Sequence, residues 1–177
     1  MVIKSRIKNK FAEDLFTKKY KPRIVKPKKG KYIKKPDQII QELESMVNMG
    51  IQLIRFQDTN FLSVNRQALR MLIPFFAKHP SLKCYIETRP ETINPTSVQL
   101  LKALNVDGVG MGVEASADLF REDQLNRHCT TSKIKQAFSL LSEAGIKRTA
   151  YNIIGLPGQT EADIKSTISL NAVINPD

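Results

Sequence analysis

The chain has 177 residues, the usual length of one domain, and its 41% hydrophobic and 25% charged content excludes a wholly disordered or fibrous protein. The formal net charge of +11 is concentrated in residues 1–35, which hold 14 Lys or Arg and two acids, whereas residues 36–177 hold 14 basic and 15 acidic groups. The body of the protein is therefore nearly neutral, and the basic character belongs to an N-terminal arm.

The basic arm, residues 1–35, has no apolar period, and its simplest interpretation is a solvated loop or linker. A second interpretation is contact with the phosphate groups of a nucleic acid. No apolar stretch follows the basic N-terminus, and no apolar run approaches the roughly 20 residues of a membrane span. We therefore expect a cytoplasmic protein with no secretory signal and no membrane partner.

Residues 36–177 repeat one unit, in which a helix-period segment and a turn are followed by a short apolar run rich in β-branched residues. This alternation predicts parallel β/α architecture. The sequence predicts strands over 51–57, 83–88, 108–113 and 147–154. It predicts helices over 36–49, over 63–78, from the Asn94–Pro95 cap to about 104, over 131–144, and from Thr160, which caps the last helix with Asp163. The helix over 63–78 is capped by Ser63 and is expected to be kinked or broken at Pro74.

The predicted count is four strands and five helices. Four parallel strands alone leave two sheet edges, whereas a barrel or a doubly wound sheet normally has five or more strands. We therefore expect an α/β fold over residues 36–177, a partial (β/α) barrel that is TIM-barrel-like and lacks its first and last strands.

Polar residues follow each predicted strand, where parallel β/α folds bind their ligands. They form the segments 57–61, 87–91, 112–116 and 152–158. Carboxylates at neighbouring strand ends suit the hydroxyls and the amino group of a zwitterionic nucleoside. Gly110, Gly112 and Gly155 would let a flat ring or a backbone approach closely. The alternative for any one of these residues is that it caps a helix or solvates a loop.

Isolated residues in the chain favour structural roles. Cys84 and Cys129 are 45 positions apart and indicate half-buried thiols, not a disulfide framework or a CxxC metal pair. His79 and His128 lack metal-ligand spacing and indicate surface or capping roles. Arg55 is expected in a structural ion pair, and the strand tyrosines Tyr85 and Tyr151 in the core or lining the barrel.

The order of the strand-end motifs resembles one known family. These motifs are DTNF (58–61), YIETRPETI (85–93), GVGMGVEAS (108–116) followed by LNRHCTT (125–131), and NIIGLPGQTEADI (152–164). Together, over residues 31–177, they resemble the radical S-adenosylmethionine (SAM) superfamily, in its cobalamin-associated and oxygen-independent coproporphyrinogen dehydrogenase-like branches. The resemblance implies an enzyme with a partial (β/α) barrel and with SAM lying across the strand ends.

The resemblance also implies roles for individual residues in binding the cofactor, while the catalytic residues stay unassigned. Glu87 and Glu114 match polar positions that approach SAM, and Arg127 matches an arginine that approaches its carboxylate. The strand-end loop that meets the methionyl amino group is matched by Gln57, Asp58, Thr59 and Asn60. The segment that lies against the adenine is matched by Ile153, Ile154, Gly155, Leu156 and Pro157.

The chain departs from the family in its cysteines. The family holds a [4Fe–4S] cluster on a CxxxCxxC loop, and this sequence has no such loop. The resemblance implies that a longer relative uses this cluster, reduced by a flavodoxin or ferredoxin, to cleave SAM to a deoxyadenosyl radical, and a cobalamin-binding domain is a further implied part. We expect this chain alone to be an inactive fragment of such an enzyme, since the radical step needs three thiolates.

The substrate stays open between a small molecule and a tRNA. Two rival interpretations also stay open. The first is a non-enzymatic α/β module whose basic arm binds nucleic acid. The second is another parallel β/α barrel, such as an aldolase, although no lysine directly follows any of the four predicted strands.

Overall fold

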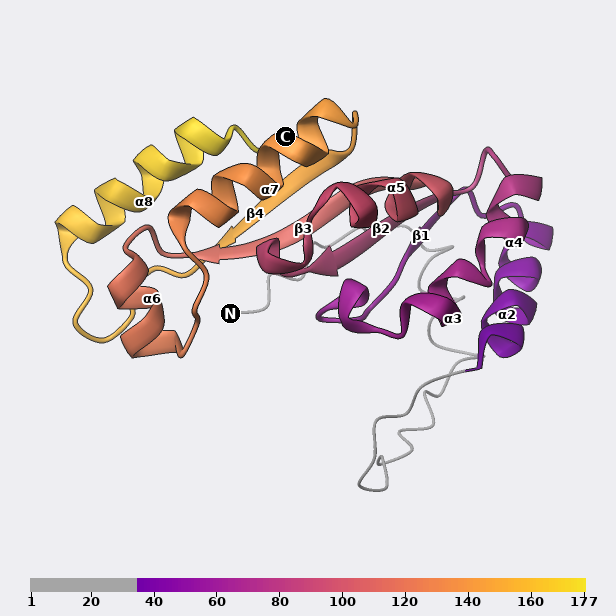
Figure 1. Cartoon of the computed structure of the whole chain (residues 1–177), viewed down its shortest axis with the longest axis horizontal. Helices are drawn as coiled ribbons and strands as arrows, with labels where there is room; N and C mark the ends of the chain where they lie inside the picture. Colours follow the sequence, from indigo (N-terminus) through magenta and orange to yellow (C-terminus); the bar gives the residue numbers. More distant parts are fainter. Residues whose placement is uncertain (1–34) are drawn as a thin grey trace, which may run out of the picture. The chain divides into compact units, whose positions relative to one another are not determined.

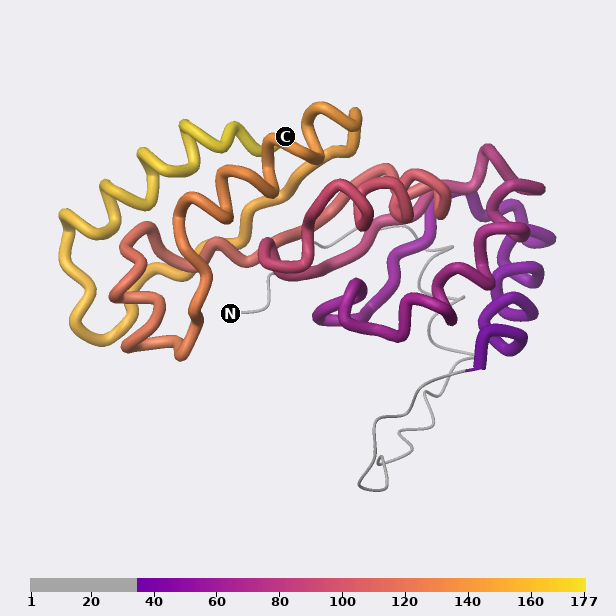
Figure 2. The backbone as a smooth tube through the Cα atoms, viewed as in Figure 1, coloured from indigo at the N-terminus to yellow at the C-terminus, as the bar shows by residue number. Residues whose placement is uncertain are grey.

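A computed structural model of the chain describes residues 35–177, and a four-stranded parallel sheet lies at its centre (Figure 1). The strands are β1 (Leu53–Arg55), β2 (Lys83–Thr88), β3 (Val106–Glu114) and β4 (Lys147–Asn152), in the spatial order β1-β2-β3-β4. Figure 2 shows the backbone returning to the sheet after the helical segments that separate two strands, so that consecutive strands lie side by side. The predicted basic arm falls outside the described residues except for Lys35.

Helical segments precede, connect and follow the strands. They are α2 (Pro36–Asn48), η1 (Phe61–Ser63), α3 (Arg66–Arg70), α4 (Ile73–Lys78), η2 (Pro90–Thr92), α5 (Pro95–Ala103), α6 (Asp118–Leu125), α7 (Thr131–Glu143) and α8 (Glu161–Ile174). In the part of the chain that the structure describes, no helix is long and apolar enough to cross a membrane.

The predicted strands and most helices are confirmed, with shifted ends. The strand over 83–88 has the predicted bounds, whereas β1 and β4 are shorter than the predicted 51–57 and 147–154. Among residues 35–177, β1 pairs with β2 alone and so lies at the edge of the sheet, which limits its length. The strand count of four is correct, but the count of five helices is wrong, since 63–78 forms two helices and α6 was not predicted.

The prediction of one helix capped by Ser63 is wrong. Ser63 ends η1, and Asn65 caps α3 by accepting a hydrogen bond from the Gln67 amide at 2.9 Å. Pro74 lies in the first turn of α4, where its missing N–H needs no helical partner, so the predicted break at this proline is confirmed.

Alternation along the strands separates two faces of the sheet. On β2, Cys84, Ile86 and Thr88 are buried, while Tyr85 and Glu87 between them are half-buried. The buried face joins one hydrophobic core with side chains of the helices, including Phe76, Leu101, Phe138 and Leu141. The opposite face carries tyrosine, glycine and charged residues, and it leads to the strand ends.

The N-terminus of α5 offers a test of local stability. Asn94 Oδ1 accepts the Ser97 amide at 3.0 Å, and Ser97 Oγ accepts the Asn94 amide at 2.8 Å, which forms a reciprocal cap. We expect Asn94→Ala to lower the free energy of unfolding by about 1 kcal/mol. Urea unfolding followed by circular dichroism measures this change. Thr96→Ala, at an exposed position of the same turn, is the control and should change stability by less than half as much.

Candidate functional site

A pocket of about 260 Å³ opens at the carboxyl ends of the strands. Its walls come from the ends of β2 and β3, from β4, from the loop after β1 and from the loop between α6 and α7. The lining residues are Thr59, Glu87, Thr88, Arg89, Gly110, Gly112, Glu114, Arg127 and Tyr151. This set is polar and holds both signs of charge, as a zwitterionic ligand requires.

Arg127 and Glu114 form the central ion pair of the pocket. Arg127 Nη1 donates to Glu114 Oε1 at 2.6 Å, and the side chains are only 14% and 18% exposed. Glu91 Oε2 lies 3.6 Å from Arg127 Nη2, and both of these buried atoms lack a hydrogen-bond partner, as does Arg127 Nε. Unpaired buried donors are costly, and hydrogen bonds from Nη2 and Nε to a ligand carboxylate would satisfy them.

The backbone at Glu114 is bent into a conformation that its residue type disfavours. Glu114 has φ of +65°, in the left-handed region, and the pairing of β3 with β4 shifts register between Gly112 and Glu114. This bend aims the carboxylate into the pocket. A side chain on Gly112 would collide with Glu114 Oε1, and its Cβ would lie 2.8 Å from Arg127 Nη1, so any larger residue would displace the ends of these two side chains.

A second polar cluster surrounds Glu87. Glu87 Oε1 forms an ion pair with Arg55 Nη2 and accepts the Tyr151 hydroxyl at 3.2 Å. The hydroxyls of Tyr151 and Tyr85 are 3.1 Å apart, and the Arg55 guanidinium lies 5.1 Å from the centre of the Tyr85 ring. Burial and the hydrogen bond with Tyr85 raise the pKa of Tyr151, so the phenol stays protonated and can donate. The predicted ion pair of Arg55 is confirmed.

The glycines of β3 make room for these tyrosines. A Cβ on Gly108 would lie 2.8 Å from Tyr85 Cδ2, and one on Gly110 would lie 2.7 Å from both tyrosine hydroxyls. The side chains that approach these glycines of β3 are therefore the rings of Tyr85 and Tyr151. The sequence predicted a close approach at Gly110 and Gly112, and the neighbours that use this space are side chains of the chain itself.

The structure brings together four of the predicted cofactor-binding residues, namely Thr59, Glu87, Glu114 and Arg127. Asn60 stands at the start of η1 without lining the pocket, and its Oδ1 accepts the hydroxyl of the lining residue Thr88 at 2.8 Å, while Gln57 and Asp58 are exposed. Arg89, Thr88 and Tyr151 also line the pocket, and the cofactor prediction did not include them. The sequence carries a signal for Arg89 and Thr88, because they directly follow Glu87.

The predicted adenine segment lies next to Glu114. The Ile153 amide donates to the Glu114 carbonyl at 2.9 Å, while the side chains of Ile153 and Ile154 are 38% and 66% exposed. Gln159 holds the following turn, since its Oε1 accepts the amides of Gly155 at 2.7 Å and Leu156 at 3.3 Å. The segment therefore presents exposed apolar side chains and adjoins the backbone of Glu114, but none of its residues lines the pocket.

The two histidines take structural positions. The ring of His79 packs against Phe75 with centroids 4.6 Å apart, and His128 Nδ1 lies 3.0 Å from Glu122 Oε1. Within residues 35–177, no group of three metal-ligating side chains comes together.

The cysteines of this chain do not fit an iron–sulfur cluster. Cys84 is 0% exposed and Cys129 is 4% exposed, so both are more deeply buried than the predicted half-buried thiols. Burial raises the pKa of Cys84 to about 12, and burial with the nearby Glu91 carboxylate raises the pKa of Cys129 to about 11. Cluster ligands are thiolates, and these two thiols are held protonated.

This burial predicts unreactive thiols. At pH 8 we expect the native chain to react with a disulfide reagent such as Ellman's at least a hundredfold more slowly than a free thiol, since the reactive species is the exposed thiolate. Unfolding in guanidinium should release two thiols per chain at the normal rate. Rapid reaction of either cysteine in the native chain would contradict its burial.

Comparison with known proteins places these features in a family. A family model described as the radical SAM superfamily matches residues 16–170. The chain is 26% identical over 151 residues to the anaerobic magnesium-protoporphyrin IX monomethyl ester cyclase of Cereibacter sphaeroides, a match that covers 82% of this chain and 24% of that protein. The chain thus spans about a quarter of the length of this curated relative.

Solved structures share the fold at lower identity. The radical SAM methyltransferase TsrM from Kitasatospora setae, solved with cobalamin and a [4Fe–4S] cluster, matches with a TM-score of 0.71 and 19% identity over 80% of this chain and 27% of its own. The coproporphyrinogen III oxidase HemN from Escherichia coli matches with a TM-score of 0.67 and 20% identity, over 81% of this chain and 35% of its own. The predicted α/β fold of TIM-barrel-like, radical SAM type is thereby confirmed.

Proposed function

Because this chain belongs to the radical SAM superfamily, we propose that its strand-end pocket binds SAM as part of a radical SAM enzyme. The observation that carries this proposal is the Arg127–Glu114 pair, in which a nearly buried guanidinium keeps two nitrogens without hydrogen-bond partners. A ligand carboxylate matches those donors in charge and in the hydrogen bonds that it can accept. The neighbouring carboxylates suit the ammonium group and the ribose hydroxyls of the same molecule.

Each wall of the pocket takes one part of the ligand in this proposal. Arg127 binds the methionyl carboxylate, and Glu87 and Glu114 accept hydrogen bonds from the ammonium group or the ribose. The loop from Gln57 to Asn60 lies beside the ammonium group through Thr59, and the segment Ile153–Pro157 covers the adenine with its exposed apolar side chains. These residues bind and orient the ligand and exclude water, which is the protein's contribution in cofactor enzymes.

The reaction itself needs parts that the described residues do not supply. Bound SAM supplies the adenosyl group with which the family begins its radical chemistry. The cluster that this chemistry requires does not fit Cys84 and Cys129, so we propose that this chain alone does not catalyse the reaction. A [4Fe–4S] cluster, a cobalamin and a flavodoxin or ferredoxin reductant are proposed only for a longer enzyme of this type.

The substrate of such an enzyme is proposed only as a class, a small molecule or a tRNA. The similar proteins are named for different molecules: a magnesium-protoporphyrin ester for the cyclase and coproporphyrinogen for HemN. A second structure of TsrM contains tryptophan as the substrate. These substrates differ from one another, and the chain spans a minor part of each of these proteins, so they do not select one substrate.

Isothermal titration of the chain with SAM tests the binding proposal directly. We expect a dissociation constant in the high-micromolar range or weaker. The matched control ligand is 5′-methylthioadenosine, which keeps the adenosine and the sulfur but lacks the amino-acid part. It should bind at least tenfold more weakly, because it offers no carboxylate to Arg127. Absence of heat with SAM, or equal affinity for the two ligands, would overturn the proposed mode of binding.

A further inference from the structure

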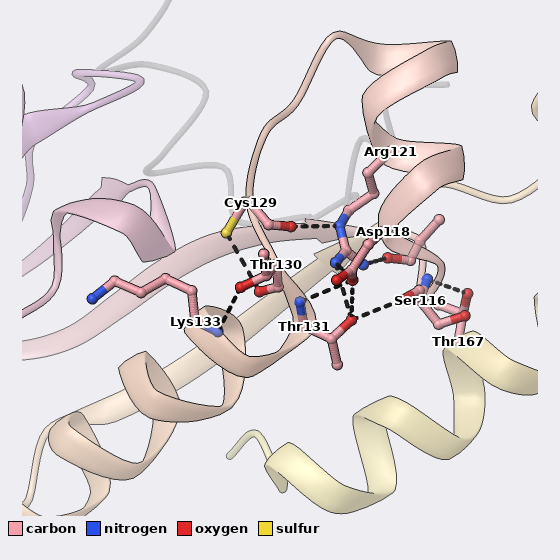
Figure 3. Close-up of polar contacts among 9 residues, drawn as sticks. Ser116, Asp118, Arg121, Cys129, Thr130, Thr131, Lys133 and Thr167 are labelled. Atoms are coloured by element: carbon pink, nitrogen blue, oxygen red, sulfur yellow. Dashed lines mark hydrogen bonds and ion pairs between the residues drawn. The ribbon is translucent and has the colours of Figure 1, made fainter.

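Arg121 is a buried charged residue that lies outside the pocket. Its side chain is 1% exposed and donates in four directions: to the Cys129 carbonyl at 3.0 Å, to the Thr131 hydroxyl at 3.0 Å, to the Ala115 carbonyl and to Asp118 Oδ1 (Figure 3). The hydrogen bond from the Thr131 hydroxyl lowers the pKa of Asp118, which keeps a negative charge beside the guanidinium. We call Ser116, Asp118, Arg121 and Thr131 the Arg121 cluster.

The Arg121 cluster ties together the two segments that carry the pocket's ion pair. The Ala115 carbonyl directly follows Glu114, whose backbone is in the left-handed region. The Arg121 carbonyl accepts the Arg127 amide at 3.0 Å, and the Cys129 carbonyl lies two residues beyond Arg127. Arg121 thus holds the residue after Glu114 and both sides of the loop that carries Arg127.

Other members of the cluster brace the same region. The Thr131 amide donates to Asp118 Oδ1 at 2.9 Å, and the Thr131 hydroxyl lies 2.9 Å from the Ser116 carbonyl. The Ser116 amide donates to the Thr167 hydroxyl at 3.1 Å, which joins the strand end to α8. The strand end, α6, the start of α7 and α8 therefore meet through hydrogen bonds at one point, as the dashed lines in Figure 3 show in part.

A buried arginine is a poor device for stability alone, because desolvation of the charge offsets much of what its hydrogen bonds contribute. Its rigid fork of donors is well suited to fixing the relative positions of several backbone segments. We propose that Arg121 is a positioning residue, which holds Glu114 and Arg127 in the geometry that binds the carboxylate of SAM. This proposal rests on the proposed function of the pocket.

The test compares Arg121→Lys with Arg148→Lys in the full chain. Arg148 is also buried, at 9% exposure, and is also paired with an aspartate, because its Nε lies 2.9 Å from Asp177 Oδ2, but it does not line the pocket. Both variants keep the positive charge and lose the several N–H donors of the guanidinium group. Thr131→Val is a second variant, which removes one member of the cluster and keeps Arg121.

Hydrogen exchange without ligand tests the positioning step by itself. In Arg121→Lys and Thr131→Val, we expect the backbone amides at positions 127 and 131 to exchange at least tenfold faster than in the wild type, while Arg148→Lys leaves them unchanged. Equal exchange in all variants would overturn the positioning role, whatever the wild-type chain binds.

Titration with SAM then tests the link to the pocket. We expect the dissociation constant to rise at least tenfold in Arg121→Lys and to change less than twofold in Arg148→Lys, compared at a temperature at which both variants are folded. Faster exchange with unchanged affinity would show that the cluster serves the fold and not the ligand, and would overturn the inference. If the wild-type chain binds no SAM, the proposed function fails, and the exchange result still decides the role of Arg121.

Discussion

Replacing Arg127 with methionine is expected to weaken the binding of SAM by roughly 10- to 100-fold. Methionine keeps a long unbranched side chain but removes the donors that face the ligand carboxylate. A hydrogen bond to a charged group contributes about 1.5–3 kcal/mol, and about 1.4 kcal/mol corresponds to tenfold in affinity. The loss should be large here, because the Arg127 side chain is only 14% exposed and is poorly screened by water. Isothermal titration with SAM measures it.

Two comparisons make the Arg127 result specific. Lys147→Met removes the same charge from an exposed pair with Asp107, and it should change the affinity less than twofold. The affinity for 5′-methylthioadenosine should be equal in wild type and Arg127→Met, since this ligand has no carboxylate. If Arg127→Met weakened both ligands equally, the effect would come from general damage to the pocket, and the assignment of Arg127 to the carboxylate would be wrong.

Local patterns in the sequence were sufficient to predict the sheet and several of the helix starts. Asn94 and Pro95 predict a cap and a first helical turn from their types and order alone, and the structure has α5 starting there, with Ser97 completing the cap. The same holds for Thr160 and Asp163 at the start of α8. Because parallel strands bring their carboxyl ends to one edge, four strands were enough to predict that Thr59, Glu87 and Glu114 meet around one pocket.

The features that the sequence did not predict depend on contacts between distant residues. Glu87 contacts Arg55, 32 positions away, and Tyr151, 64 positions away, and no local pattern carries that pairing. Helix α6 (Asp118–Leu125) is short and starts after Ala117, which offers no side-chain cap, and it is held by the buried Arg121. The burial of an arginine is set by tertiary contacts and runs against its usual exposure.

The positive φ of Glu114 leads to a second prediction of large effect. Removing the carboxylate by Glu114→Ala or Glu114→Gly should destabilise the chain, because it leaves Arg127 without its close partner, and it should weaken the binding of SAM about tenfold or more. The order of stability of the alanine and glycine variants should be the reverse of the usual one. At an ordinary strand position alanine is more stable than glycine by roughly 0.5–1 kcal/mol. At Glu114 glycine should be the more stable by about 1 kcal/mol, because only alanine retains a Cβ that disfavours the left-handed backbone.

Chemical unfolding of the two Glu114 variants, together with Thr149→Ala and Thr149→Gly on β4, measures this order. Thr149 pairs with Gly110 inside the sheet and has no positive φ, so its alanine variant should be the more stable of the two. The same order at both positions would mean that Glu114 leaves the left-handed region in solution. If glycine is more stable than alanine at position 114 alone, the left-handed backbone at Glu114 costs stability that glycine recovers. If SAM binding is also weakened in both Glu114 variants, this strained turn serves to aim the carboxylate at Arg127 and the ligand.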